Sequence, residues 1–191
     1  PSALGVFLES ATHAGRGSEL ESLRFVMVAG EAFPKDMVAE AVRAFPRARV
    51  ENLYGPTEAA IYASFFSCST AEIRSINTPI GKPTANARLY VLDRSRRSTG
   101  VGVPGELAIG GAGVARGYLN RPELTAAAFV ADPFVPGGRL FLTGDLVRWL
   151  PEGEIEYFGR IDHQVKVRGF RVEPGEIEGL LNQHEGVQTS V

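Results

Sequence analysis

Hydrophobic and polar residues alternate along the first third of the chain in a pattern that predicts helices and strands in turn. Residues 2–11 have apolar positions at helical spacing, and residues 23–30 form a short apolar run rich in β-branched side chains, as expected of a buried strand. Residues 34–45 show a second helical pattern that begins at a proline, and residues 48–54 a second strand pattern. A strand, a helix and a strand in this order predict a parallel sheet with a crossover connection.

The middle of the chain has a different pattern. Short apolar runs at 87–93, 105–111, 138–150 and 153–158 are separated by glycine and proline. This arrangement predicts antiparallel strands in a sheet or a small barrel. One helix is expected among them, at residues 121–130, with a proline at its start.

The pattern changes again near the end of the chain. Residues 163–173 predict two short strands around Gly169, and residues 174–183 predict a helix that starts at Pro174. The expected domains are residues 1–160, made of an α/β sheet portion (1–80) and a β-rich portion (81–160), and residues 161–191, the beginning of a smaller α+β domain. The expected fold class is therefore α/β with an antiparallel β subdomain.

The composition narrows the classes of protein that the chain can belong to. Of its 191 residues 44% are apolar, enough for a packed core, and 20 basic and 22 acidic residues are well mixed for a net charge of −2. We therefore expect no nucleic acid and no membrane as partner, since no basic stripe and no apolar run of about 18 residues is present. The single cysteine, Cys68, fits a cytoplasmic protein without internal disulfides. Because the chain starts with Pro1 and closes on an incomplete strand pattern, we expect it to be a piece of a longer protein.

The first candidate for chemistry is NLYGPTE, residues 52–58. It follows a predicted strand, so its turn lies at the carboxyl edge of the sheet, where open α/β folds bind ligands. Tyr54 is suited to stack on a purine and Asn52 to read its amino edge, while Thr57 can contact a phosphate and Glu58 can hold Mg²⁺. The alternative is a Gly-Pro turn in which Thr57 caps a helix.

Three further stretches are ambiguous by themselves. Asp145 in the TGD sequence is typical of a turn, but its carboxylate is also suited to accept both hydroxyls of a ribose. Residues 110–117 resemble a dinucleotide-binding fingerprint, but Arg116 replaces its third glycine, which favours a β-turn. Arg160 and Lys166 belong to a basic run that is normally a solvated face.

The order of these stretches is specific. NLYGPTE, GELAIGGAGVARGYLNRPELTAAAF, LFLTGDLVRW and GRIDHQVKVRGFRVEPGEIE together strongly resemble the adenylation domains of nonribosomal peptide synthetases, within the adenylate-forming superfamily, over nearly the whole chain. The resemblance implies the C-terminal part of the large domain of such an enzyme and the start of its small domain. It also implies a reaction in which ATP and an amino acid form aminoacyl-AMP and pyrophosphate. The aminoacyl group then moves to the phosphopantetheine thiol of a carrier protein.

The resemblance assigns roles in nucleotide binding and catalysis. The nucleotide would be bound by the backbone of Gly30, Glu31 and Ala32, by Asn52 and Tyr54 at the adenine, by Tyr157 beside it, by Asp145 at the ribose and by Arg160 at the ribose or phosphates. Thr57 would contact the α-phosphate and Glu58 would ligate Mg²⁺. Thr57, Glu58 and Arg160 are therefore the expected catalytic residues.

The resemblance also implies a hinge and a substrate pocket. Asp162 would be the hinge about which the small domain rotates, and Lys166 and Gly169 would face the site during thiol transfer. The side-chain pocket would include Met27, Ala29, Leu53, Ile61 and Tyr62, which are apolar apart from one phenol and predict a small apolar amino acid. Leu142 departs from the family pattern, in which a basic residue precedes TGD.

Two other functions are compatible with the same residues. An acyl- or aryl-CoA ligase shares the fold and the first step but transfers the acyl group to a free thiol. A non-catalytic nucleotide-binding module is the other alternative, because the resemblance places the phosphate-binding loop before Pro1 and a catalytic lysine beyond Val191. For the same reason we expect the isolated chain to be inactive.

Overall fold

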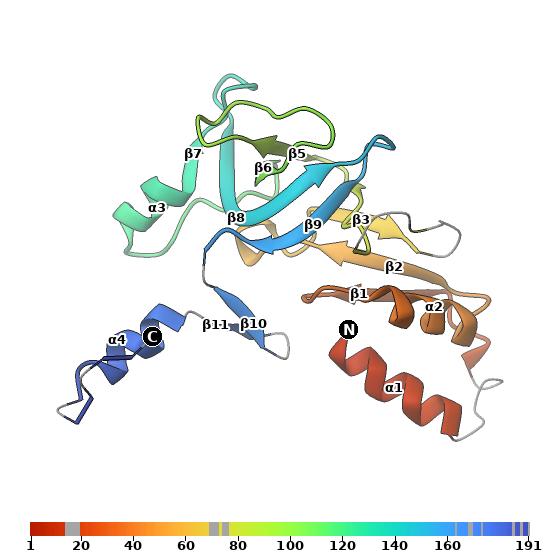
Figure 1. The fold of residues 1–191 in the computed structure, drawn as a ribbon. Coiled ribbons are helices and arrows are strands. Elements are labelled where there is room, and N and C mark those ends of the chain that lie inside the picture. Colours follow the sequence, from red (N-terminus) through yellow and green to blue (C-terminus); the bar gives the residue numbers. More distant parts are fainter. Residues whose placement is uncertain are drawn as a thin grey trace.

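The computed structural model describes residues 1–13, 20–68, 73, 77–162, 164–167, 170–172, 174–184, 186–187 and 189–190 (Figure 1). The helices are α1 (Ser2–His13), α2 (Lys35–Ala44), the 3₁₀ helix η2 (Thr57–Ala59), α3 (Pro122–Ala128) and α4 (Pro174–Leu181). The strands are β1 (Phe25–Ala29), β2 (Arg49–Tyr54), β3 (Ser64–Ser67), β4 (Lys82–Pro83), β5 (Ala87–Leu92), β6 (Gly105–Gly111), β7 (Phe129–Ala131), β8 (Arg139–Trp149), β9 (Ile155–Arg160), β10 (Val165–Val167) and β11 (Phe170–Val172).

The first sheet has the order β1-β2-β3-β4 and is mixed. Strands β1 and β2 run parallel, with Phe25 opposite Arg49, so the predicted strand, helix and strand unit is confirmed. Strand β3 returns antiparallel to β2, which the sequence pattern did not predict. The link between β2 and β3 contains only η2 and a turn, and a parallel return needs a much longer crossover.

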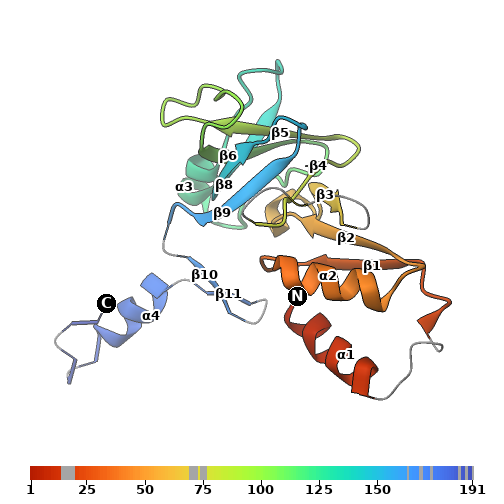
Figure 2. The same ribbon diagram turned by 45° about the vertical axis from the view of Figure 1, so that its right-hand side comes forward.

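Helices α1 and α2 lie on the same side of this sheet, as both views show (Figures 1 and 2). The strand alternation directs Val28 into the core beneath them, where it is 5% exposed, while the neighbouring Met27 is 62% exposed. The core includes Leu8 of α1, Val38 and Ala41 of α2, and Val50 of β2. Apolar positions at helical and strand periods therefore meet in one layer between helices and sheet.

The second sheet is antiparallel, in the order β5-β6-β8-β7, and β9 also pairs with β8. Strand β8 is 11 residues long, so β7 pairs with its first part and β9 with its last part. The helix predicted at 121–130 is shorter, because α3 ends at Ala128 and Phe129 begins β7 by pairing with Phe141. Pairing with β8 thus overrides the helical pattern of the last residues.

A second core joins the two sheets. It contains Tyr54 and Ala63 from the first part of the chain and Leu107, Val147 and Ile155 from the antiparallel sheet. Backbone bonds connect the same parts, since Ile80 N donates to Ile155 O at 2.8 Å and Ile155 N donates to Gly81 O at 2.9 Å. The ends of β2, β8 and β9 are thereby held near one another.

The last elements follow β9 (Figure 1). Strands β10 and β11 form an antiparallel pair, with Lys166 opposite Arg171, and α4 follows, as the pattern of apolar residues predicted. Gly169, between the two strands, lies outside the described residues. Among the residues that the structure describes, no helix is long and apolar enough to cross a membrane. The observed fold is α/β with an antiparallel β subdomain, which confirms the predicted fold class.

Candidate functional site

A cleft lies at the carboxyl ends of the parallel strands β1 and β2. It contains about 830 Å³ of empty space, part of it open to solvent. Six residues expected to bind a nucleotide line it: Gly30, Glu31, Ala32, Asn52, Tyr54 and Tyr157. The rings of Tyr54 and Tyr157 are 6.3 Å apart and tilted by 40°. The cleft thus combines aromatic walls with an amide and the turn that follows β1.

The amide of Asn52 has a defined orientation in this cleft. Its Nδ2 donates to the backbone oxygen of Pro79 at 2.8 Å, and the residue is 4% exposed. A carbonyl oxygen only accepts hydrogen bonds, so the atom beside Pro79 must be the amide nitrogen. Oδ1 is consequently the acceptor end of this side chain, which suits the exocyclic amino group of an adenine.

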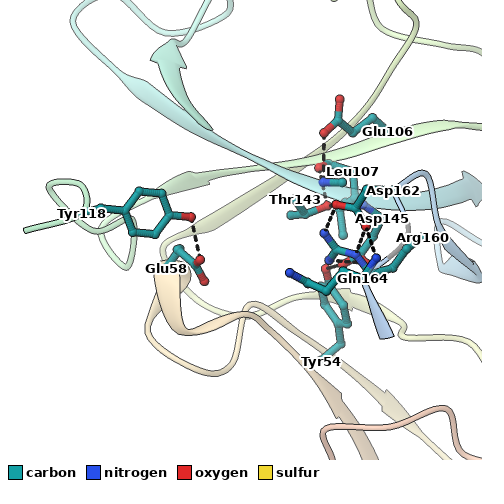
Figure 3. A network of polar contacts seen from close by, with 11 residues as sticks. Tyr54, Glu58, Glu106, Leu107, Tyr118, Thr143, Asp145, Arg160, Asp162 and Gln164 are labelled. Atoms are coloured by element: carbon teal, nitrogen blue, oxygen red, sulfur yellow. Dashed lines mark hydrogen bonds and ion pairs between the residues drawn. The ribbon is translucent and has the colours of Figure 1, made fainter. Parts of the chain in front are cut away.

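Asp145 lies at the centre of a polar network beside the cleft (Figure 3). It is 4% exposed, its Oδ2 accepts a hydrogen bond from the Tyr54 hydroxyl, and its Oδ1 accepts one from Arg160 Nη1 at 3.1 Å. Burial, followed by the negative charge of Asp145, raises the pKa of Tyr54 well above its ordinary value. Tyr54 therefore stays protonated and donates to the carboxylate over the whole neutral range.

The local conformation of β8 directs Asp145 into this network. The register between β6 and β8 shifts here, so that Thr143, Gly144 and Asp145 bulge opposite Leu107. The Thr143 hydroxyl donates to Leu107 O at 2.8 Å and accepts from Asp145 N at 3.0 Å, which fixes the bulge. Gly144 has a φ of +72°, and its N–H donates to a Glu106 carboxylate oxygen at 2.9 Å.

Arg160 connects Asp145 to the expected hinge residue. Its Nε and Nη2 donate to the two carboxylate oxygens of Asp162, both at 2.6 Å, in a bidentate pair. These bonds, opposed by burial and supported by the charge of Asp145, raise the pKa of Arg160. The backbone of Ile161 donates to Gly144 O at 2.8 Å. The segment after β9 is thus held against the bulge of β8.

A second cleft lies beside this network. Its lining includes Glu58, Glu106, Tyr118, Leu142, Arg160 and Asp162, and it contains about 1090 Å³ of empty space, part of it open to solvent. Glu58 is 8% exposed and accepts a hydrogen bond from the Tyr118 hydroxyl at 2.7 Å. Opposite charges, those of Glu58 and Arg160, therefore border one cavity.

The residues of the second cleft fit a magnesium ion that arrives with a nucleotide. The described residues contain no group of three or more side chains suited to hold a metal ion by themselves. Mg²⁺ is commonly bound by one or two carboxylates together with substrate phosphates. Glu58 offers one such carboxylate, and Arg160 a cation for the phosphates.

The positions of Thr57 and Lys166 say little about their expected roles. Thr57 is exposed at the start of η2. The residue at the cap position is Pro56, and no side chain caps η2, so the alternative in which Thr57 caps a helix is wrong. Lys166 lies in β10, and its role in thiol transfer stays a prediction.

The five expected substrate-pocket residues do not gather in one cavity. Leu53 lines the first cleft and Tyr62 lines a separate cavity with Ala63 and Thr84. Met27 and Ile61 are 62% and 60% exposed. Ala29 is exposed as well and pairs with Leu53 across the strands, so Met27, Ala29 and Leu53 share one face of the sheet.

Several residues at the site have no role in the sequence-based interpretation. Asn77 lines the first cleft and donates from Nδ2 to Tyr157 O at 3.0 Å. Tyr118, Glu106 and Thr143 line the second cleft. Thr143 belongs to the TGD stretch and Tyr118 follows the glycine-rich stretch at 110–117, so both were within reach of sequence analysis. Nothing in the sequence around Glu106 or Asn77 indicates their contacts.

Comparison with known proteins identifies the family. The model of the family described as AMP-binding enzyme matches residues 1–119. The chain is 53% identical over 187 residues to "Polyketide synthase PksN" of Bacillus subtilis (strain 168), which covers 98% of the chain and 3% of that protein. It is 44% identical over 172 residues to "Bacitracin synthase 1" of Bacillus licheniformis, which covers 90% of the chain and 3% of that protein.

The solved structures show the same relationship. The fold matches "NpsA-ThdA, an artificially fused Adenylation-PCP di-domain NRPS from Klebsiella oxytoca" with a TM-score of 0.83 and 30% identity, over 98% of the chain and 34% of that structure. The chain therefore spans a small part of the curated relatives and about a third of this structure. The family model, the curated relatives and the solved structures therefore agree on one family. The chain belongs to the AMP-binding enzyme family, among the adenylation domains of nonribosomal peptide synthetases.

Proposed function

We propose that this chain forms part of the active site of an adenylation domain that activates an amino acid with ATP. The observation that carries the proposal is the Tyr54–Asp145–Arg160 network, which borders both clefts. The products would be aminoacyl-AMP and pyrophosphate. An α-phosphate oxygen gains charge as the carboxylate of the amino acid attacks, so cationic groups near it accelerate the reaction.

The residues of the first cleft would bind the nucleoside. The base would lie against the rings of Tyr54 and Tyr157, with its amino group on Asn52 Oδ1. The carboxylate of Asp145 would accept hydrogen bonds from the ribose hydroxyls. A carboxylate has about four lone pairs on its two oxygens, so it can accept hydrogen bonds from several donors at once.

The residues of the second cleft would act on the phosphates. Arg160 would contact the ribose or a phosphate, and Glu58 would hold Mg²⁺. Thr57, which precedes Glu58 at the start of η2, would contact the α-phosphate. The metal ion, when bound, neutralises phosphate charge and orients the leaving pyrophosphate. Arg160 keeps its positive charge throughout, because its raised pKa lies far above neutrality.

We further propose that the aminoacyl group passes to the phosphopantetheine thiol of a peptidyl carrier protein. The matching Klebsiella oxytoca structure is a fused adenylation and PCP di-domain, which supports this partner. Asp162 would be the hinge between the two half-reactions, with Lys166 and Gly169 on the segment that rotates. The boundary of the small domain would then fall at residues 160–162.

The amino acid is proposed to be small and apolar. Of the five expected pocket residues, Met27, Ala29, Leu53 and Ile61 are apolar, and Tyr62 adds one phenol. None carries a charge that could pair with an ionic side chain. The residues that complete the pocket in the family lie outside this chain, so the proposal concerns the chemical class alone.

The test is pyrophosphate exchange by the full-length synthetase that contains this chain, with a panel of amino acids. Exchange that depends on a small apolar amino acid is the expected result. A preference for Asp, Glu, Lys or Arg would contradict the substrate class. Formation of a thioester with free coenzyme A, without transfer to a carrier protein, would favour an acyl-CoA ligase. ATP binding without any exchange would favour a non-catalytic nucleotide-binding module.

The isolated 191-residue chain is expected to form no acyl-AMP. In the family, the phosphate-binding loop and a lysine that stabilises the transition state lie outside the positions that this chain matches. Groups of this kind contribute about 10²–10³ each to the rate. Amino-acid-dependent exchange by the purified chain alone would contradict this expectation.

A further inference from the structure

Tyr118 lies opposite Glu58 in the second cleft. Figure 3 shows its hydroxyl pointing at the carboxylate, to which it donates at 2.7 Å from a position 60 residues away along the chain. Tyr118 is located in the loop between β6 and α3. Neither the motif analysis nor the proposed reaction assigns it a role.

The same loop also holds the main chain of Glu58. Ala115 N donates to Glu58 O at 2.8 Å, so one loop binds both the backbone and the side chain of this residue. Glu58 is 8% exposed, so most of its surface is covered by neighbouring residues. Two contacts from one loop therefore restrain the direction of the carboxylate.

Tyr118 is itself held in place. Its backbone N–H donates to Thr125 Oγ1 at 2.9 Å, and its ring meets Phe129 edge-on, with centroids 5.4 Å apart and planes at 73°. Gly117 has a φ of +144°, and a Cβ there would be 2.4 Å from Thr125 Cγ2. The backbone before Tyr118 therefore approaches α3 as closely as glycine permits, which sets the position of the phenol.

We propose that Tyr118 is a positioning residue that holds the Glu58 carboxylate in the orientation for Mg²⁺. This inference rests on the proposed function, in which Glu58 is the magnesium ligand. A carboxylate that binds a metal ion is typically oriented by a hydrogen bond from a neighbour, and loss of such a neighbour costs about 10- to 100-fold in metal affinity or activity. One phenol bond does not exhaust the acceptor capacity of a carboxylate.

The test uses the full-length synthetase with the Tyr118→Phe substitution, which removes the hydroxyl and keeps the ring against Phe129. Mn²⁺ replaces Mg²⁺, and its binding is followed by electron paramagnetic resonance with a non-hydrolysable ATP analogue and no amino acid. We expect Mn²⁺ affinity to fall about 10-fold or more. Tyr90→Phe is the matched control, because Tyr90 lies in β5, stacks on Phe134 and is not among the residues that line either cleft. This control should leave Mn²⁺ affinity unchanged.

Wild-type Mn²⁺ affinity in Tyr118→Phe would overturn the inference. A thermal melt checks that the variant folds. If Tyr118→Phe does not fold, Thr125→Val is tested in its place, because this change removes the hydroxyl that accepts the Tyr118 N–H. A smaller fall in Mn²⁺ affinity is then expected, and an unchanged affinity would overturn the inference.

Separate measurements distinguish this inference from the proposed function. Unchanged Mn²⁺ affinity in Glu58→Gln would overturn the metal role of Glu58 and with it the role of Tyr118. A wild-type enzyme that binds Mn²⁺ with the ATP analogue but shows no amino-acid-dependent pyrophosphate exchange would contradict amino-acid activation alone. The comparison of Tyr118→Phe with wild type would still decide the role of Tyr118.

Discussion

Replacing Asp145 with Asn separates the structural role of this carboxylate from its role in nucleotide binding. The amide has the same shape, so it leaves no cavity, and its oxygen can still accept one of the two bonds from Tyr54 and Arg160. Arg160 keeps its bidentate pair with Asp162, so its charge is not left unpaired. The substitution therefore mainly replaces a charged carboxylate, which would accept hydrogen bonds from two ribose hydroxyls, by a neutral amide.

The size of the effect follows from these contacts. A hydrogen bond to a charged group contributes about 1.5–3 kcal/mol. Since about 1.4 kcal/mol corresponds to a tenfold change in affinity, ATP should bind roughly 10- to 150-fold more weakly. The free energy of unfolding should fall by less than the ~3–5 kcal/mol expected for a stranded buried charge, because Asp162 remains beside Arg160.

The assay is calorimetric titration of the full-length synthetase with ATP and Mg²⁺, together with urea unfolding. Asp132→Asn is the matched control, because Asp132 is also buried, at 6% exposed, but pairs with Arg88 at 3.2 Å instead of with Tyr54 and Arg160. This control should lower stability and leave ATP affinity unchanged. If Asp145→Asn behaves in the same way, Asp145 is a structural residue and the ribose assignment is wrong.

Three further predictions concern the hinge, the tyrosines and the bulge. Asp162→Pro should slow thioester transfer by about tenfold or more relative to Asp162→Ala, because both variants remove the carboxylate that pairs with Arg160 but only proline fixes φ at a rotating position. Adenylate formation should differ between these two variants by no more than a few fold, and equal thioester transfer by both in single-turnover assays would contradict the hinge. Burial and the charge of Asp145 raise the pKa of Tyr157 to about 12 and that of Tyr54 in the same direction. The contribution of these two tyrosines to the free energy of unfolding should therefore be constant around neutral pH and fall between pH 10 and 12, because both lose their protons more easily in the unfolded chain. Titration of all five tyrosines near pH 10, followed by tyrosinate absorbance, would disprove this. Gly144→Ala should lower the free energy of unfolding by about 1–2 kcal/mol because of the positive φ at this position, and a further loss should come from the new Cβ, 2.7 Å from the Arg160 guanidinium. Gly153→Ala, with a φ of +74° and no atom within 4 Å of the new Cβ, should show only the first loss in urea unfolding. Equal losses in the two variants would rule out the clash.

Much of the fold could be predicted from the sequence, because secondary structure depends on short-range periodicity. The alternation at 25–29 and 49–54 indicated two strands, and the helix between them required a parallel pair. The glycine and proline spacing after residue 80 indicated antiparallel strands. The order of four motifs was enough to indicate the family, and through it the residues of the candidate site.

The contacts within the site were decided by tertiary structure. Tyr54 and Asp145 are 91 residues apart, and Glu58 and Tyr118 are 60 residues apart, so no local pattern connects them. Strand β7 forms although its residues continue a helical pattern, because Phe129 pairs with Phe141 of β8. The bulge at Thr143–Asp145 depends on the register between β6 and β8. Sequence periodicity records which face of an element is buried, but the partner across that face is chosen only when distant segments pack together.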